Sequence, residues 1–339
     1  MDAPSERGSL ADVSRRAGVS TATASRVLNG SAHPVSEATR ERVMQAAHDL
    51  SYSPSALARA LVTRRTRIIG VIVGDVADPY FAEITRGVED VAGRAGYLTI
   101  VCNADRRPAV EREYLNLLRD YNAEGAVFAG SGLLESDEEL DASVDQARRQ
   151  GMHVVALAPR AFGGSSVSVD NRAAAYDLVD YLVSLGHRTI GFVAGPPDLI
   201  SARERLEGFH AALAGHSLEP GPLCKGDFSY ASGHAAALRL LAEPRLPDAV
   251  VAANDETAIG VLMGLRSAGV DVPRTLSVAG IGDTRPARFL ELTTVSVPTF
   301  ELGASAARRI IAGDGAEGEG TVVIPHRLVP RATSIRRPA

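Results

Sequence analysis

The chain has 339 residues, of which 45% are hydrophobic and 23% are charged, and its formal net charge is −5. This length predicts about two domains, and the composition is that of a soluble globular protein. No apolar run approaches the ~20 residues of a membrane span. The N-terminus lacks the apolar core of a signal peptide, so we expect a cytoplasmic protein.

Arginine is concentrated at the start of the chain. Residues 1–67 hold ten arginines against six acidic residues, a balance of +4, so the remaining residues carry −9. A basic head on an acidic body is typical of a protein that binds a polyanion through the head alone. Chance segregation of charge over a short segment is the alternative interpretation.

The first 52 residues have the pattern of short helices. Apolar residues recur at helical spacing before Gly18, which is expected to end the first helix in a left-handed conformation. Ser20 is expected to cap a second helix, and Ser36 a third. Two short helices joined by a glycine-containing turn, with a third to complete a small core, predict a helix-turn-helix head over residues 1–52. Residues 53–66, with the helical stretch SALARALV and the basic run TRRTR, are expected to form a hinge helix or linker.

From Ile68 onward the hydrophobic period changes. Apolar runs such as RIIGVIVG and DAVVAAN suit strands that are buried on both faces, and they alternate with amphipathic helices. This alternation predicts α/β structure with doubly wound parallel sheets, and there are enough units for two lobes over residues 67–339. In this architecture ligands bind in the cleft beyond the carboxyl ends of the strands.

The second helix of the head has an exposed face rich in hydroxyl groups. Its stretch, GVSTATASRVLNG, lacks the Glu, Lys and Gln of an ordinary solvated helix. In a helix-turn-helix unit the N-terminal part of this helix enters the DNA major groove. Short hydroxyls can donate to phosphates, and an arginine can bind a guanine edge through two hydrogen bonds. The residues expected to contact DNA are Ser20, Thr21, Ala22, Thr23, Ser25, Arg26 and Asn29. A helical bundle without a DNA role is the alternative.

Several long runs of the chain are collinear with a known family. They include SLADVSRRAGVSTATASRVLNG and VSEATRERVMQAAHDLSYSPSALARAL, and they continue through IIGVIV, DPYFAEI, LGHRTIGFVAGP, ANDETAIG and LVPRATSIRR. In these runs the sequence resembles the lac repressor/gal repressor family of transcription regulators over nearly its whole length. The resemblance implies a two-lobed body like the type I periplasmic binding proteins. It also implies a homodimer that binds a pseudo-palindromic operator in double-stranded DNA and responds to a small-molecule effector, such as a sugar, a sugar derivative or another small metabolite.

The resemblance assigns a DNA contact to the hinge. In the family the hinge helix folds only on specific DNA and inserts a leucine into the minor groove, and the matching residue here is Leu61. An apolar wedge of this kind kinks a flexible base step. Ala58 lies one helical turn earlier on the same face. Considered alone, Leu61 would be a core-facing residue of a short helix. In the head, Thr21 and Ala22 fall where family members vary their operator preference.

The resemblance also assigns residues to the cleft. Tyr80 and Phe81 follow the first strand, where family members stack an aromatic ring on the effector, although packing at the start of a helix is the alternative for Phe81. Arg205 matches the family's effector-binding arginine, and Asn254 follows a strand end. The neighbouring Asp255 could be merely a first-turn helix acid. The expected effector-binding residues are Tyr80, Phe81, Arg160, Arg205, Asn254 and Asp283.

Two positions depart from the sugar-binding members. Gly282 stands where they usually have an acid after a strand, and Pro159 stands where an Asp is common before Arg160. The loss of two carboxylates weakens a monosaccharide assignment. It also predicts a relatively basic pocket, which would suit an acidic or phosphorylated effector.

Enzyme motifs are poor in this sequence. Gly130-Ser131-Gly132 follows a strand, but Glu135 stands where the dinucleotide fingerprint needs its third glycine. The two cysteines, Cys102 and Cys224, lie far apart and form no zinc-ligand spacing. We therefore expect no enzyme, no cofactor and no metal. The alternative function is a periplasmic-type sugar-binding protein without a DNA role, which should have a signal peptide and no basic head.

Overall fold

The computed structural model describes residues 8–29, 33–53, 66–313 and 320–337. The chain divides into two compact units, residues 1–66 and 67–339. No helix of the described residues is both long enough and apolar enough to span a membrane.

The first unit is a small helical core with the predicted caps. Its helices are α1 (Leu10–Ala17), α2 (Thr21–Leu28) and α3 (Glu37–Asp49). Gly18 ends α1 at a φ of 64°, a left-handed conformation that glycine adopts without strain. The Ser20 hydroxyl accepts from the Thr23 amide at 3.1 Å, and Ser36 caps α3 in the same way. The buried side chains that hold the three helices together are small and apolar: Val13, Ala17, Ala24, Val27, Val43, Ala46 and Ala47.

The second unit has two lobes, each built on a sheet of six described strands. The strand order is β11-β5-β4-β3-β1-β2 in the first lobe and β12-β10-β9-β8-β6-β7 in the second. Every neighbouring pair of these strands runs parallel except β10 and β12. The prediction of doubly wound parallel sheets is therefore confirmed.

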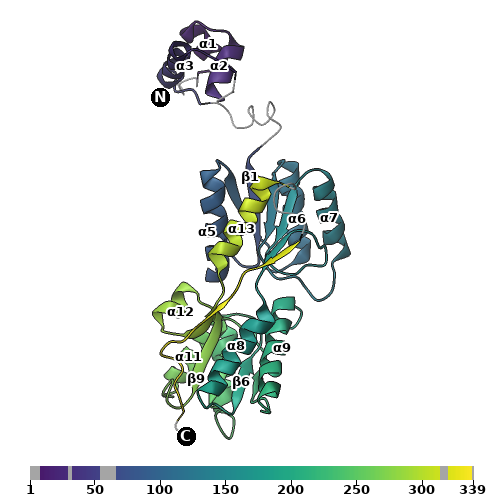
Figure 1. Cartoon of the computed structure of the whole chain (residues 1–339), viewed down its shortest axis with the longest axis vertical. Coiled ribbons are helices and arrows are strands. Elements are labelled where there is room, and N and C mark those ends of the chain that lie inside the picture. Colours follow the sequence, from purple (N-terminus) through teal and green to yellow (C-terminus); the bar gives the residue numbers. More distant parts are fainter. Residues whose placement is uncertain (1–7, 30–32, 54–65, 314–319, 338–339) are drawn as a thin grey trace, which may run out of the picture. The chain divides into compact units, whose positions relative to one another are not determined.

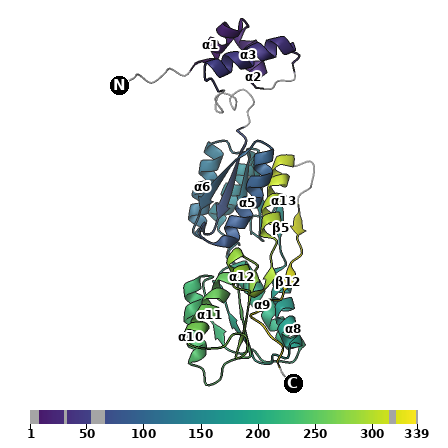
Figure 2. The same cartoon turned by 90° about the vertical axis from the view of Figure 1, so that its left-hand side faces the viewer.

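Helices cover both sheets, as Figures 1 and 2 show. The first lobe contains β1 (Ile68–Val73), α5 (Pro79–Arg94), β2 (Leu98–Asn103), α6 (Pro108–Asp120), β3 (Gly125–Phe128), α7 (Glu138–Arg149), β4 (His153–Ala156), β5 (Ser166–Ser168), α13 (Thr299–Ala312) and β11 (Thr321–Val323). The second lobe contains α8 (Asn171–Ser184), β6 (Ile190–Val193), α9 (Ile200–Gly215), β7 (Leu223–Cys224), α10 (Tyr230–Leu241), β8 (Ala249–Ala252), α11 (Asp255–Ser267), β9 (Ser277–Gly282), α12 (Arg285–Phe289), β10 (Thr293–Ser296) and β12 (Arg327–Val329).

The described part of the chain passes between the two lobes three times. It leaves the first lobe between β5 and α8, returns between β10 and α13, and leaves again between β11 and β12. Figure 2 shows α13 beside α5 in the first lobe and β12 in the second lobe. Each lobe is thus assembled from segments far apart in the sequence, which the order of predicted elements did not reveal.

Three pairs of helices in the described part of the chain pack with their backbones in direct contact: α5 with α13, α10 with α11, and α8 with α9. A Cβ atom at Gly87 of α5 would overlap the Phe300 carbonyl of α13, and one at Gly303 would overlap the Ile84 carbonyl in return. In the second lobe Gly260 makes the same kind of contact with α10. Because carbonyl groups of a helix cannot move aside, these positions require glycine.

We predict that Gly87→Ala destabilises the second unit by about 1–3 kcal/mol, since the added methyl must push α13 away from α5. Gly93→Ala is the matched control on the same helix, because a Cβ there meets nothing within 4 Å. It should stabilise the protein by about 0.5 kcal/mol through helix propensity alone. Thermal unfolding of both variants measures the difference, and equal effects would contradict the close α5–α13 contact.

Candidate functional site

The exposed face of α2 carries most of the predicted DNA contacts. The side chains that stand exposed on or beside this helix are short or polar: Ser20, Thr21, Ala22, Arg26 and Asn29. Thr23 and Ser25 are partly buried, and the Ser25 hydroxyl accepts from the Asn29 side-chain amide at 3.1 Å. Ala24 and Val27 face the core of the head instead. The seven residues therefore belong to a helix that is anchored to the head by its opposite face.

The arginines of the head differ in how they are paired. Arg16 binds Asp49 at 2.7 Å and Arg15 binds Asp12 at 2.9 Å. Arg26 and Arg42 are exposed and form no ion pair within the described part of the chain. Their charge is thus available to a polyanion. The two remaining predicted DNA contacts, Ala58 and Leu61, lie outside the described residues.

A cavity lies between the two lobes, where the carboxyl ends of both sheets meet. Its wall includes segments after β1, β3 and β4 of the first lobe and after β6, β7 and β8 of the second. Parallel α/β sheets place ligands at such positions. Of the six predicted effector-binding residues, five line this cavity: Tyr80, Phe81, Arg160, Arg205 and Asn254.

Tyr80 and Phe81 lie in the first turn of α5, directly after Pro79 and the helix cap Asp78. Asp78 accepts from the Tyr80 amide at 2.9 Å, and the two rings meet edge to face with centroids 5.3 Å apart. Phe81 is buried in the core of the lobe and also lines the cavity. The two interpretations of Phe81, core packing and cavity wall, are therefore compatible.

Arg205 lies buried on α9 at the second-lobe wall. Its Nε donates to Asn171 Oδ1 at 3.0 Å, and one η nitrogen donates to the Ala253 carbonyl at 2.6 Å. The guanidinium group also lies over the Phe228 ring, 5.9 Å from its centroid. These contacts fix the orientation of Arg205 before any ligand arrives.

Phe228 is a cavity residue that the sequence reasoning missed. Its φ of 72° is unusual for an aromatic residue and costs of order 1–3 kcal/mol. The Asn254 side-chain amide donates to the Phe228 carbonyl at 3.0 Å, while Asn254 Oδ1 caps α11 by accepting from Thr257. The ring packs so tightly against Gly195 that no side chain would fit there. Strain held by several contacts is typical of functional sites. The sequence pattern that could have indicated Phe228 is Asp227 followed by an aromatic residue, shortly after the strand β7.

Arg160 lines the cavity, but its charge is already paired with a carboxylate of the protein. Its two η nitrogens donate to the Glu111 carboxylate at 2.7 and 2.9 Å, and one of them also donates to the Gly130 carbonyl. Both side chains of this ion pair are only 6% exposed. The sequence reasoning missed Glu111 because it lies 49 residues away, on α6.

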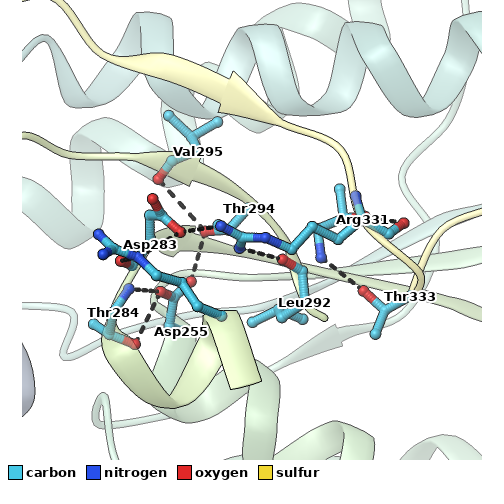
Figure 3. A network of polar contacts seen from close by, with 10 residues as sticks. Asp255, Asp283, Thr284, Leu292, Thr294, Val295, Arg331 and Thr333 are labelled. Carbon is cyan, nitrogen blue, oxygen red and sulfur yellow. Dashed lines mark hydrogen bonds and ion pairs between the residues drawn. The ribbon is translucent and has the colours of Figure 1, made fainter. Parts of the chain in front are cut away.

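Asp283 is the one predicted effector-binding residue that does not belong to the cavity wall. The residue adopts a φ of 60° directly after β9, and its carboxylate binds Arg331 and Arg288. Figure 3 shows Arg331 extended toward Asp283 from the C-terminal segment. The carboxylate is thus engaged by these two arginines outside the cavity wall, whereas the neighbouring Thr284 lines the cavity.

Asp255, at the start of α11, belongs to the cavity wall. Figure 3 shows its carboxylate between Thr284 and Thr294. It accepts from the Thr284 amide at 2.7 Å and from the Thr294 hydroxyl at 2.6 Å. Burial raises the pKa of Asp255, and these donors partly offset that effect. A Cβ at Gly282 would lie 2.9 Å from Asp255 Oδ2. The Asp255 carboxylate therefore occupies the space that a side chain at position 282 would need.

The expectation of a relatively basic pocket is wrong. Among the described residues, the arginines in the cavity wall are Arg106, Arg160 and Arg205. The acidic residues in it are Asp78, Glu111, Glu135, Asp137, Asp141, Asp255 and Glu256. Most of these acids lie in helices or loops away from Pro159 and Gly282, the two positions at which sugar-binding members usually have a carboxylate. The tertiary structure therefore supplies more carboxylates than the two departures remove.

Glu256 carries the clearest electrostatic signature of this acidic wall. Burial, followed by the carboxylates of Asp78 and Asp75, raises the pKa of Glu256 to about 7, while Arg106 opposes the shift. Asp78 and Asp75 belong to the first lobe and Glu256 to the second. Like charges thus face each other across the cavity.

We predict that Glu256→Gln raises the melting temperature at pH 8 by about 2 °C and leaves it unchanged at pH 4.5. The folded protein holds the Glu256 proton more tightly than the unfolded chain, whose pKa is near 4.5. Stability is therefore lost as the pH rises from about 4.5 to about 7, and Gln removes this loss. Because Glu256 is only half-buried, solvent screens the effect and the expected gain is small.

Glu219→Gln, at an exposed position outside the cavity, is the control for this comparison. It should leave the melting temperature unchanged at both pH values. An equal gain for Glu256→Gln at pH 8 and at pH 4.5 would contradict the raised pKa.

Comparison with known proteins agrees with this arrangement. Residues 9–55 match the bacterial regulatory proteins of the lacI family, and residues 179–334 match the periplasmic binding protein-like domain. The chain is 35% identical over 303 residues to the HTH-type transcriptional repressor CytR of Escherichia coli K12, covering 88% of this chain and 87% of that protein. It is 32% identical over 326 residues to catabolite control protein A of Priestia megaterium, covering 94% and 96%.

A solved structure of the lac repressor dimer, bound to operator and the anti-inducer ONPF, has the same fold. The TM-score is 0.87 at 28% identity, and the match covers 97% of this chain and 100% of that chain. Together with the relatives above, it extends the similarity over both units. The chain belongs to the lacI family of bacterial regulatory proteins, which are transcription regulators rather than enzymes.

Proposed function

We propose that this protein is a cytoplasmic, ligand-responsive repressor of transcription that binds a pseudo-palindromic operator as a homodimer. A small-molecule effector, such as a sugar, a sugar derivative or another small metabolite, binds in the cavity between the lobes. The observation that carries the proposal is the exposed face of α2, which combines short hydroxyls with Arg26, whose charge forms no ion pair within the described residues. The lac repressor structure, solved with operator and anti-inducer, supports this combination of partners.

The chemistry of α2 suits the DNA major groove. Thr21 and Ala22 are small and exposed at the start of the helix, so the backbone can approach the bases closely. Ala22 offers a methyl contact to thymine, and Arg26 offers a bidentate contact to guanine. Ser20 and the other hydroxyls donate to phosphates, which sets the register of the helix without reading sequence.

The exposed apolar side chains of the body support a dimer. Leu98 and Val101 on the edge strand β2 are 61% and 42% exposed, and Phe289 on α12 is 84% exposed. Exposed apolar side chains mark a protein partner when they gather in one contiguous patch. We propose a second copy of this chain as that partner, in keeping with the dimer in the lac repressor structure. A two-fold dimer presents two heads to two half-sites, hence the pseudo-palindrome.

The cavity suits a ring-bearing effector. Tyr80 and Phe81 contribute aromatic groups from the first lobe, and Phe228 contributes one from the second. Arg205 is oriented by its protein contacts and offers further donor capacity, while Asn254 acts at least partly through Phe228. A periplasmic-type sugar-binding protein would have a similar cavity. The head, which matches the lacI family, favours the regulator.

The hinge, residues 53–66, is proposed to couple the two sites. SALARALV contains good helix formers but spans only about two turns, and isolated helices shorter than roughly 12–15 residues are marginal in water. Its folding would therefore need the partner hinge and the DNA minor groove, with Ala58 and Leu61 facing the DNA. An effector that changes the spacing of the hinges would then change operator affinity.

We predict that Arg26→Ala lowers affinity for the operator by at least about tenfold, since the loss of a bidentate base contact costs about 1–3 kcal/mol. Titration of DNA from the gene's own upstream region, followed by gel shift, measures the change. Arg239→Ala on α10 of the second lobe is the matched control and should leave affinity unchanged. Unchanged affinity for Arg26→Ala with a folded protein would refute the role of α2.

We predict that Leu61→Ala reduces both DNA bending and sequence specificity, because it removes the wedge but barely alters helix propensity. Fluorescence energy transfer between the ends of a labelled operator fragment measures the bend. Val62→Ala, at the next position in the chain, is the control and should leave the bend unchanged. Bending that is as strong for Leu61→Ala as for the unmodified protein would rule out the wedge.

A further inference from the structure

Arg160, one of the two first-lobe arginines in the cavity wall, is neutralised by the protein itself. Arg160 donates to both oxygens of Glu111, and its guanidinium group lies 5.2 and 5.9 Å from the ring centroids of Phe128 and Phe162. Both charged side chains are almost fully buried. A ligand anion that displaced Glu111 would leave a buried carboxylate without its partner, which is strongly unfavourable.

The other two cavity arginines are also engaged. Arg106 lies 3.8 Å from the Asp78 carboxylate, which belongs to the same wall. Arg205 donates to Asn171 and to the Ala253 carbonyl. Burial lowers the pKa of Arg205, and nearby groups that include Asp255 oppose this shift. Arg106 is therefore paired with a carboxylate, whereas Arg205 has neutral hydrogen-bond partners and lies within the electrostatic influence of Asp255.

The carboxylates of the cavity are less fully compensated. Glu256 is half-buried and has no hydrogen bond or ion pair of its side chain within the described part of the chain. Asp255 is held by hydroxyl and amide donors, which carry no charge. Among the described residues, seven acids and three arginines line the cavity, and like charges that line a cleft with low-dielectric walls reinforce one another, which favours a negative potential inside it.

We propose that Glu111 determines the charge class of the effector: by neutralising Arg160 it keeps the cavity negative, so the site accepts neutral or cationic ring compounds and rejects phosphorylated or carboxylated ones. The inference deepens the proposed function, because it takes the cavity to be the effector site. It also replaces the acidic effector that the sequence alone suggested.

The absence of tryptophan from the chain allows a direct measurement of this potential. Phe228→Trp places a single reporter on the second-lobe wall, and Phe162→Trp places one on the first-lobe wall beside Arg160. Circular dichroism and melting temperature identify which reporters are folded. Two reporters keep the test available if one ring position does not accept the larger indole.

Quenching by caesium and by iodide, at pH 8 and constant ionic strength, compares a cation and an anion at the same site. After normalisation to free N-acetyltryptophanamide, the caesium constant should exceed the iodide constant at least about twofold, because a negative cleft concentrates cations. A ratio at or below one for a folded reporter overturns the proposal.

Glu111→Gln tests the residue itself in the Phe162→Trp background. Gln retains an acceptor for Arg160 but releases its positive charge, so iodide quenching should rise at least about twofold. Glu113→Gln is the matched control, because it removes one negative charge from an exposed position of the same helix, outside the cavity wall. Equal responses of the two variants would show a general charge effect and overturn the role of Glu111.

Glu256→Gln, which breaks no ion pair among the described residues, gives a second variant if Glu111→Gln does not fold. It removes a carboxylate from the second-lobe wall, so iodide quenching of the Phe228→Trp reporter should rise. Unchanged quenching there would overturn the negative potential of the cavity.

Matched compounds connect the potential to the ligand class. Glucose with glucose 6-phosphate, and adenosine with adenosine 5′-monophosphate, differ by one phosphate and can be ranked by thermal shift on the unmodified protein. The parent of each pair should bind more tightly, and tighter binding of a phosphorylated member overturns the proposal. Failure of operator binding would refute the proposed function but leave the quenching ratio unaffected, so the two failures are distinguishable.

Discussion

The three passages of the chain between the lobes are the constraint on which the rest of the second unit depends. The first lobe is completed by α13 and β11, which follow the strands of the second lobe, and the second lobe is completed by β12. The two sheets are therefore joined by several connections and border a common cavity. Strand ends of both lobes contribute to its wall, as parallel sheets require. Tyr80 and Arg205 are far apart in the sequence but line the same space for this reason. The helix pairs with glycine-to-carbonyl contacts keep each lobe compact around its sheet.

The cavity wall is organised by pairing within the protein. Glu111 holds Arg160, Asn254 holds the strained Phe228, and the threonines at 284 and 294 hold Asp255. Figure 3 shows how Arg331, from the segment after the last passage, joins this arrangement through Asp283. A ligand would therefore meet side chains that are already oriented, which lowers the entropic cost of binding. The same pairing determines which charged groups of the wall are left unpaired and can interact with a ligand.

The head is stabilised mainly by local interactions rather than by contacts between distant segments. Its core consists of small apolar residues, and each of its described helices has a serine cap, so a short segment folds with few large side chains. Local sequence dictates these caps, and for that reason Ser20 and Ser36 could be predicted. The exposed face of α2 was predictable as well, because the period of Ala24 and Val27 identifies the opposite, buried face.

Sequence by itself determined the helical head, the alternation of strands and helices, and the cavity position of Tyr80, Phe81, Arg160, Arg205 and Asn254. These depend on local periodicity or on motifs collinear with the family. Only the tertiary structure decided the charge of the cavity and the surroundings of Glu111, Phe228 and Asp283. Short strands such as β5 and β11, three residues each, show no period, so the passages between lobes stayed hidden. Pairing between residues distant in the chain depends on three-dimensional distance, and neither composition nor spacing contains that information.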